Sequence, residues 1–211
     1  MTPLMFVAAV IAAYLLGSIP FGLIVGRLKS GIDIRQQGSG KTGATNVMRS
    51  VGRKYGVLTI VLDVAKAAGA VLLAKVIVSS DAVVAGVATQ RELAQVLAGF
   101  AAIAGHNWPV FAGFRGGRGV AAAFGTLLAI YPPAGILGVE VLAIAALVSR
   151  HMSLGSMLGM VAVVGLLVPL TTFYGFPVIF FVYCILVAGL VVLQHRDNIR
   201  RLRQGVERKL W

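Results

Sequence analysis

Apolar residues along the chain occur in long runs separated by short polar connections. Seven runs can be distinguished, at residues 4–26, 56–79, 94–112, 119–133, 134–150, 153–170 and 176–194. A helix needs about 20 predominantly apolar residues to cross the hydrocarbon core of a bilayer. The pattern therefore predicts an all-α, polytopic integral membrane helical bundle with about seven transmembrane helices. The runs at 94–112 and 119–133 are short or interrupted by glycine and proline, so five full spans remain an alternative.

The composition supports this assignment and predicts one membrane domain over residues 1–211. Hydrophobic residues make up 58% of the chain and charged residues only 12%, about half of the roughly 25% that is usual in soluble domains. A chain with so few charges cannot cover a surface that faces water. No basic residue precedes the first apolar run, unlike the start of a cleaved signal peptide, so we expect that run to be retained as a helix. The only cysteine, Cys184, has no partner for a disulfide or a cysteine metal site.

The positive charges lie almost entirely on alternate connections. Sixteen of the 19 lysines and arginines fall in the first, third and fifth connections and in the C-terminal tail. They are Arg27, Lys29, Arg35, Lys41, Arg49, Arg53, Lys54, Arg115, Arg118, Arg150, Arg196, Arg200, Arg201, Arg203, Arg208 and Lys209. The other connections, at 80–93, 131–134 and 171–175, hold only Arg91. Because basic loops stay in the cytoplasm, we expect the N-terminus outside and the C-terminus in the cytoplasm.

The segment RQQGSGKTGATN, residues 35–46, ends in the Gly-Lys-Thr of a nucleotide-binding P-loop, but the rest of the P-loop pattern is absent. Arg35 occupies the position of the first glycine, and a membrane helix rather than a strand precedes the segment. Glycines can nevertheless turn backbone N–H groups towards one anion. The segment offers Gly38, Gly40 and Gly43 for this purpose, with Ser39, Thr42, Thr45 and Asn46 as side-chain donors. It therefore predicts a phosphate cradle without a nucleotide-binding fold.

A second polar element, GHNWPVFAGFRGGRGVA at 105–121, lies on the same predicted side of the membrane. Arg115 and Arg118 flank Gly116 and Gly117 where a helix is expected to begin. Guanidinium groups and the N-terminus of a helix both suit phosphate oxygens. An RNA-binding RGG tract is the alternative, but the segment is short and lies between two membrane segments, so we expect no nucleic-acid partner.

Further polar residues occur at the ends of runs and within them. His195 and Asn198 are three residues apart and share one helix face close to the membrane surface, where a site and a solvated surface are both possible. Residues 200–209 are more typical of a solvated basic tail. Asp63 and Lys66 share a face inside the second run, and charges at membrane depth face the bundle interior. A structural ion pair is favoured there over substrate contact, whereas for His106 packing and a pocket role remain open.

Together these elements resemble the bacterial membrane glycerol-3-phosphate acyltransferases that use acyl phosphate. The matching stretches are GSIPFG (17–22), GSGKTGATNVMR (38–49), LDVAKAAGA (62–70), GHNWPVFAGFRGGRGVA (105–121) and HRDNIRRLRQG (195–205). The family usually has asparagine at position 41, lysines at 115 and 118, and glycine at 67, where this chain has Lys41, Arg115, Arg118 and Ala67. The His-x-x-x-x-Asp motif of the acyl-CoA–dependent acyltransferases does not occur in the sequence.

The resemblance implies a multi-pass protein of the bacterial cytoplasmic (inner) membrane with its active site facing the cytoplasm. It implies transfer of a fatty acyl group from acyl phosphate to the 1-hydroxyl of glycerol 3-phosphate. The products would be lysophosphatidic acid and phosphate, in the first acylation step of phospholipid synthesis. Expected partners are glycerol 3-phosphate, fatty acyl phosphate and membrane lipid, without a required protein partner.

The chemistry of this reaction suits the residues. Acyl phosphate carries a good leaving group, so orientation and charge stabilisation suffice, and we expect no covalent nucleophile, metal or cofactor. Arg49 and Arg118 are hypothesised to hold the phosphate of glycerol 3-phosphate, with Arg115 as an auxiliary. Ser39, Gly40, Thr45 and Asn46 would cradle the acyl phosphate, and His195 and Asn198 would orient the hydroxyl. Its proton would go to His195, whose ordinary pKa is near neutral, or to the leaving phosphate.

The candidate site therefore contains two sets of residues. The catalytic set is Ser39, Thr45, Asn46, His195 and Asn198, and the phosphate-binding set is Gly38, Gly40, Gly43, Arg49, Arg115, Gly116, Gly117 and Arg118. A small-anion membrane transporter is the main alternative, because transporters also use broken helices and intramembrane charge. Internal repeats would favour it, and the sequence shows none. A non-catalytic subunit that recruits acidic lipid would explain the basic tail but not the polar residues of 38–46.

Overall fold

The computed structural model describes residues 3–84, 86 and 88–210, and in this part of the chain the protein is almost entirely helical. The helices of the main bundle are α1 (Pro3–Gly17), α4 (Arg53–Ile77), α5 (Gln90–Asn107), α6 (Val120–Ile130), α7 (Pro132–Ser149), α8 (Met152–Tyr174) and α9 (Val178–Gln194). The short elements are α2 (Phe21–Ser30), η1 (Ile34–Gln36), α3 (Ala44–Ser50), η2 (Val110–Ala112) and α10 (Arg196–Arg203). Strands β1 (Val83–Val84) and β2 (Ala88–Thr89) form one antiparallel hairpin.

The apolar runs are helical, which confirms the helical membrane fold, but two of them do not match one helix. The run at 4–26 is divided between α1 and α2, and the run at 94–112 extends past α5 into η2. Within the described ranges, four segments are long and apolar enough to cross a membrane: Pro3–Ser30, α4, α7 and α8. A fifth is added if α9 and α10, which meet at a bend of 59°, form one span. Helix α6 has only 11 residues, so at about 1.5 Å per residue it is about half as long as the hydrocarbon core is thick.

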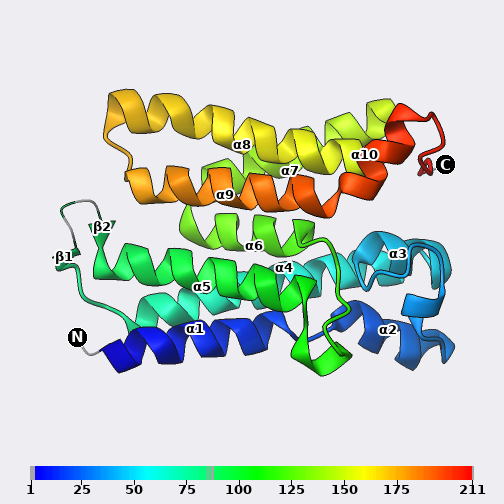
Figure 1. The fold of residues 1–211 in the computed structure, drawn as a ribbon, viewed down its shortest axis with the longest axis horizontal. Helices are drawn as coiled ribbons and strands as arrows, with labels where there is room; N and C mark the ends of the chain where they lie inside the picture. The colour runs from blue at the N-terminus through cyan, green and yellow to red at the C-terminus, as the bar shows by residue number, and fades with distance from the viewer. Residues whose placement is uncertain (1–2, 85, 87, 211) are drawn as a thin grey trace.

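The long helices lie side by side in two layers (Figure 1). Helices α1, α4 and α5 form one layer and α7, α8 and α9 the other, with α6 between them. The N-terminus and the β-hairpin lie at one end of the bundle. At the opposite end lie α2, α3, α10 and the C-terminus, so the polar elements that the sequence singles out gather at one end.

Glycines allow the helices to approach closely, as is common in membranes. A Cβ at Gly17 of α1 would lie 2.2 Å from the carbonyl oxygen of Ala102 in α5, and one at Gly105 of α5 would lie 2.3 Å from that of Tyr14. Gly138 of α7 and Gly159 of α8 meet in the same way in the other layer. These contacts hold the helices whose ends carry the candidate site.

Candidate functional site

A cavity of about 250 Å³ opens among the polar elements, between α3, α4, α6, α7, α8 and the C-terminal segment. Eight residues of the two predicted sets line it: Ser39, Gly43, Thr45, Asn46, Arg49, Arg118, His195 and Asn198. Gly38, Gly40, Arg115, Gly116 and Gly117 are not among its lining residues. The tertiary structure thus brings together side chains that are up to 159 positions apart in the sequence.

Asn46 organises the loop at 38–46. Its side chain is 3% exposed, and its Nδ2 donates to the carbonyl oxygens of Ile34 (2.8 Å), Lys41 (2.9 Å) and Gln37 (3.1 Å). Its Oδ1 accepts from the backbone N–H of Ser39 at 3.1 Å. These bonds occupy the donors of the amide, so Asn46 shapes the loop instead of offering its amide N–H groups to a ligand.

The glycines of this loop serve its backbone. Gly38 and Gly40 have φ of +56° and +68°, a conformation that residues with a Cβ rarely adopt. A Cβ at Gly38 would also lie 2.3 Å from Asn46 Oδ1. Helix α2 and η1 precede the loop, and α3 follows it, so the strand that a nucleotide-binding P-loop requires is replaced by helix.

The glycine-rich turn at 113–119 packs against the end of α5. The N–H of Gly117 donates to the carbonyl oxygen of His106 at 3.1 Å, and a Cβ at Gly117 would lie 2.1 Å from His106 Nε2. The two buried glycines, Gly116 and Gly117, therefore let the turn lie flat on α5 and present the next residue, Arg118, to the cavity. The turn is also joined to the loop at 38–46, because the N–H of Thr42 donates to the carbonyl oxygen of Gly116 at 3.3 Å.

The two arginines of the turn differ in their surroundings. Arg118 is half-buried and lines the cavity, whereas Arg115 is exposed and lies outside its lining. Burial, together with the neighbouring charge of Arg201, lowers the pKa of Arg118. An arginine nevertheless keeps its proton at neutral pH, because its ordinary pKa is above about 12. Arg118 therefore supplies a partly desolvated positive charge to the cavity.

The ion pair predicted inside the second run is confirmed. Lys66 Nζ lies 2.8 Å from Asp63 Oδ1 and donates to the carbonyl oxygen of Ile19 at 2.7 Å. The Nδ1 of His106 lies 3.4 Å from the same Asp63 oxygen. Asp63 and His106 line the cavity as well, so His106 both packs against the glycine turn and borders the site.

His195 and Asn198 lie at the bend between α9 and α10, and both line the cavity. His195 is 2% exposed, and its Nδ1 lies 2.8 Å from the carbonyl oxygen of Val191. A carbonyl only accepts, so Nδ1 carries the proton and the neutral ring keeps its lone pair on Nε2. Asn198 donates through Nδ2 to Glu207 Oε1. Both side chains border the same cavity, although His195 lies at the break between α9 and α10 and not within one continuous helix with Asn198.

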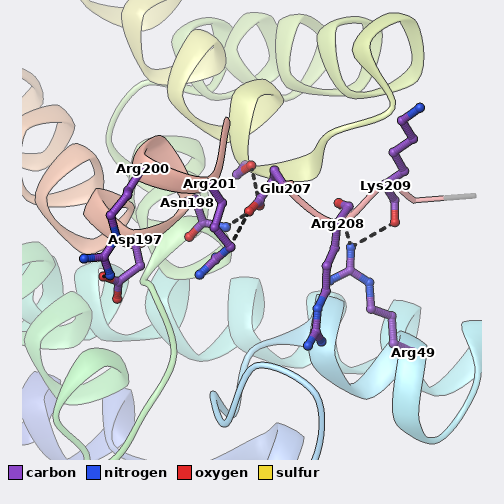
Figure 2. Close-up of polar contacts among 9 residues, drawn as sticks. Arg49, Asp197, Asn198, Arg200, Arg201, Glu207, Arg208 and Lys209 are labelled. Atoms are coloured by element: carbon purple, nitrogen blue, oxygen red, sulfur yellow. Dashed lines mark hydrogen bonds and ion pairs between the residues drawn. The ribbon is translucent and has the colours of Figure 1, made fainter. Parts of the chain in front are cut away.

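The C-terminal segment agrees only in part with the expected solvated basic tail at 200–209. Its basic residues Arg200, Arg203, Arg208 and Lys209 are exposed, as expected. The segment nevertheless turns back towards Arg49 (Figure 2), and Glu207 and Arg208 line the cavity. Glu207 accepts from Ser153 Oγ at 2.9 Å, Arg201 Nε at 2.7 Å and Asn198 Nδ2, and its side chain is 6% exposed. Arg49 Nη2 donates to the carbonyl oxygens of Arg208 and Lys209, each at 3.3 Å.

Sequence reasoning therefore missed Ser153, Glu207 and Arg208, which line the cavity. The sequence gives only a weak signal for Glu207 as a cavity residue. It is the one acidic residue after Asp197, in a segment that otherwise carries many lysines and arginines. An acid in such a stretch is expected to be paired, but the chain alone does not indicate that one of its partners, Ser153, is 54 positions away.

The charge of Glu207 is expected to stabilise the fold. Burial alone would raise its pKa, but hydrogen bonds from Asn198, Arg201 and Ser153 hold the pKa below the ordinary value. A group with a lowered pKa contributes stability that is present above its unfolded pKa, near 4.3, and is lost as the pH falls through the folded pKa. Glu207→Gln should therefore lower the Tm at pH 7 by about 4 °C, from the loss of a charge-assisted bond of roughly 1.5–2 kcal/mol.

The measurement is thermal unfolding in a non-ionic detergent at pH 7 and at several values below 4.3. The difference between the wild type and Glu207→Gln should shrink as the pH falls. Asp197→Asn is the matched control, because that carboxylate pairs with Arg200 on the exposed face of the same segment, and exposed pairs contribute little. A difference that stays constant or grows towards low pH would contradict the stabilising role of the carboxylate.

Comparison with known proteins adds independent findings. A family profile described as glycerol-3-phosphate acyltransferase matches residues 7–205. Glycerol-3-phosphate acyltransferase 3 of Dehalococcoides mccartyi is 53% identical over 202 residues, which cover 95% of this chain and 94% of that protein. Glycerol-3-phosphate acyltransferase of a Jannaschia species is 45% identical, with coverage of 94% and 89%.

Solved structures show the same similarity. The crystal structure of PlsY, an integral membrane glycerol 3-phosphate acyltransferase, in its glycerol 3-phosphate form superposes with a TM-score of 0.84 at 36% identity. The match covers 98% of this chain and 96% of that one. The lysophosphatidic acid form of the same protein gives a TM-score of 0.82, with coverage of 98% and 95%.

Proposed function

Because the chain belongs to the glycerol-3-phosphate acyltransferase family, we propose that its cavity takes the acyl group from a fatty acyl phosphate and transfers it to the 1-hydroxyl of glycerol 3-phosphate. That the chain is an acyltransferase acting on glycerol 3-phosphate follows from its relatives. The donor, the residues that bind each substrate and the orientation in the membrane are the parts that we propose.

The observation that carries the proposal is a cavity whose lining combines polar and apolar residues. Its polar lining includes Arg49, Arg118, His195, Asn198 and residues of the loop at 38–46. The apolar lining comes from α3, α4, α6, α7 and α8, and comprises Met48, Ile60, Val64, Val120, Ala121, Phe124, Val139, Leu142 and Met152. Such a cavity accommodates phosphate groups next to a fatty chain, which is the combination that acyl phosphate and glycerol 3-phosphate require.

We propose residue roles that the lining of the cavity supports. Arg49 and Arg118 bind the phosphate of glycerol 3-phosphate, for which guanidinium groups are well shaped. Arg49 now holds two carbonyl groups of the C-terminal segment, and a charged phosphate oxygen is a stronger acceptor than a carbonyl. The backbone of the loop at 38–46, with Ser39 and Thr45, cradles the acyl phosphate, and Asn46 holds that loop in shape.

The reaction then proceeds by direct attack. The 1-hydroxyl oxygen attacks the carbonyl carbon of the donor, the new C–O ester bond forms, and the bond from that carbon to the phosphate oxygen breaks. The electron pair leaves with the phosphate. The hydroxyl proton has two acceptors at the site, Nε2 of His195 and the departing phosphate. Asn198 orients the hydroxyl, and the arginines and the loop compensate the phosphate charges.

We also propose that the chain crosses a bacterial inner membrane seven times, with its N-terminus outside and the cavity facing the cytoplasm. The distribution of basic residues supports this orientation. The N-terminus and the C-terminus lie at opposite ends of the bundle (Figure 1), as an odd number of crossings requires. In this arrangement α5 and α6 complete the set of seven crossings. Because α6 covers only about half of the hydrocarbon core, the non-helical backbone that continues it must be shielded by the two layers that enclose it.

The test of the donor uses purified protein in detergent or lipid with labelled glycerol 3-phosphate. Palmitoyl phosphate is added to one sample and palmitoyl-CoA to another, and lysophosphatidic acid is quantified. Product from palmitoyl phosphate alone supports the proposal, and product from palmitoyl-CoA alone rejects the donor. If folded protein gives no product with either, uptake of labelled phosphate into proteoliposomes would test the small-anion transporter alternative.

A further inference from the structure

Lys41 is a cavity residue that the proposed roles leave unused. It lies in the loop at 38–46, at a position where the family usually has asparagine. Its side chain is exposed and lines the cavity. Among the residues that the structure describes, it forms no ion pair. It is therefore a cation at the cavity whose charge no protein group balances.

The backbone around Lys41 is held while its side chain is left free to move. Its carbonyl oxygen accepts from Asn46 Nδ2 at 2.9 Å. The next residue, Thr42, is buried, and its N–H donates to Gly116 of the glycine-rich turn at 3.3 Å. The start of the Lys41 side chain is thus fixed relative to both phosphate-binding elements, and the flexible stem of this lining residue allows its ammonium group to reach a ligand in the cavity.

The charges of the other cavity residues indicate which of the two substrate phosphates still needs a cation. Both acids that line the cavity are already engaged: Asp63 by Lys66 and His106, and Glu207 by Arg201, Asn198 and Ser153. The reaction brings two phosphate groups into one cavity. Arg49 and Arg118 are assigned to glycerol 3-phosphate, whereas the remainder of the loop at 38–46 contributes only neutral donors. Two cations at the cavity then remain for the second phosphate, Lys41 and Arg208, and Lys41 is the one that belongs to the loop at 38–46.

We propose that Lys41 Nζ binds the phosphate group of the acyl phosphate, and then the inorganic phosphate that it releases. This proposal rests on the proposed function and deepens it, because it assigns the second phosphate site to a residue. An ammonium group on a flexible stem suits this task, since its three donors follow a phosphate that changes position as the C–O bond breaks. A rigid guanidinium fork suits the phosphate that stays in place.

A general attraction of anions to the cavity is the competing explanation. A positive charge at the mouth of a cavity raises the local concentration of every anionic substrate. In that case loss of Lys41 would raise the KM values of both substrates by similar factors, and salt would reduce the effect. A specific contact instead changes only the substrate that it touches, together with the product derived from that group.

The experiment compares the wild type with Lys41→Asn, Lys41→Arg and the control Lys29→Asn in a non-ionic detergent. Lys29 is an exposed lysine of α2 that does not line the cavity. Initial rates are measured in two series. In the first, palmitoyl phosphate is varied at saturating glycerol 3-phosphate, and in the second, glycerol 3-phosphate is varied at saturating palmitoyl phosphate. Inhibition by inorganic phosphate is measured with palmitoyl phosphate as the varied substrate.

We expect Lys41→Asn to raise the KM for palmitoyl phosphate and the inhibition constant of phosphate by about tenfold each, the effect of one charge-assisted hydrogen bond. The KM for glycerol 3-phosphate should stay within about twofold, Lys41→Arg should recover most of the affinity, and Lys29→Asn should match the wild type. The assignment of Lys41 would be overturned if the KM for palmitoyl phosphate and the inhibition constant of phosphate were unchanged. It would also be overturned if the KM values of both substrates rose by the same factor. The acyltransferase function would stand in either case. A wild type that is inactive with palmitoyl phosphate would overturn the donor, and the assignment of Lys41 with it.

Discussion

Replacement of Arg118 by alanine is expected to lower kcat/KM for glycerol 3-phosphate at least about 100-fold, which corresponds to roughly 2.7 kcal/mol. Arg118 is half-buried at the cavity, where the surroundings screen its charge less than water does. A guanidinium in this position binds a phosphate with charge-assisted bonds. The phosphate of glycerol 3-phosphate does not react, so Arg118 is expected to bind it equally in the ground state and the transition state. The loss should therefore appear mainly in the KM for glycerol 3-phosphate, measured at saturating palmitoyl phosphate.

The variant should remain folded, because among the described residues Arg118 forms no ion pair, and the charges around it oppose one another: Arg201 and Arg49 repel it, whereas Glu207 and Asp197 attract it. Arg115→Ala is the matched control: it removes the same side chain from the same turn, but at an exposed position outside the cavity, and activity should stay within about threefold. Arg118→Lys should retain activity within about tenfold of the wild type, since it keeps the charge and loses only the forked geometry. Equal activity of Arg118→Ala and Arg115→Ala would remove Arg118 from the substrate site.

The substitution Asn46→Asp is expected to abolish activity and to lower the Tm by at least about 5 °C. The change is nearly isosteric, but it replaces the Nδ2 donor with an oxygen that faces the carbonyl oxygens of Ile34, Gln37 and Lys41. Acceptors left without a donor in a buried position cost about 1–3 kcal/mol each, and a buried carboxylate adds to this cost. The loop should open, so both substrates should be affected.

Thermal unfolding and initial rates with each substrate varied provide the measurements. Gln36→Glu serves as the control, because it makes the same amide-to-acid change in an exposed residue of η1, outside the cavity. That control should keep the Tm within about 1 °C and the activity within about twofold. An Asn46→Asp protein with normal Tm and kinetics would show that the four hydrogen bonds of Asn46 do not hold the loop.

The order of the helices could be predicted because it depends on local properties of the chain. In a bilayer each backbone N–H and C=O must find its partner within the same helix, so a run of apolar residues is sufficient to indicate a helix. The short length of α6 also has local causes: Gly119, with φ of +80°, precedes it, and Pro132 and Pro133 follow. The gathering of basic residues on alternate connections is a similarly local signal.

The candidate site could be predicted as a set of elements but not as a set of contacts. The motifs identified 38–46, 115–118 and 195–198, and the structure places all three at one end of the bundle. Arg118 was expected to hold the phosphate and Arg115 to be an auxiliary, and in the structure Arg118 lines the cavity and Arg115 lies outside its lining. The motifs did not indicate that Asn46 uses its amide to hold the loop, or that Gly116 and Gly117 pack on His106.

The sequence by itself therefore determined the membrane class, the helices and the polar elements at their ends, because apolar length, glycine positions and charge act over a few residues. Only the tertiary structure decided which polar side chains share the cavity, because that depends on how the helices pack. Glu207 shows the difference most clearly: its partners include Ser153, which is 54 positions away, and Arg49 reaches the same segment across 159 positions. Contacts at such separations are set by the close approach of helices at glycines such as Gly138 and Gly159, and no local pattern encodes them.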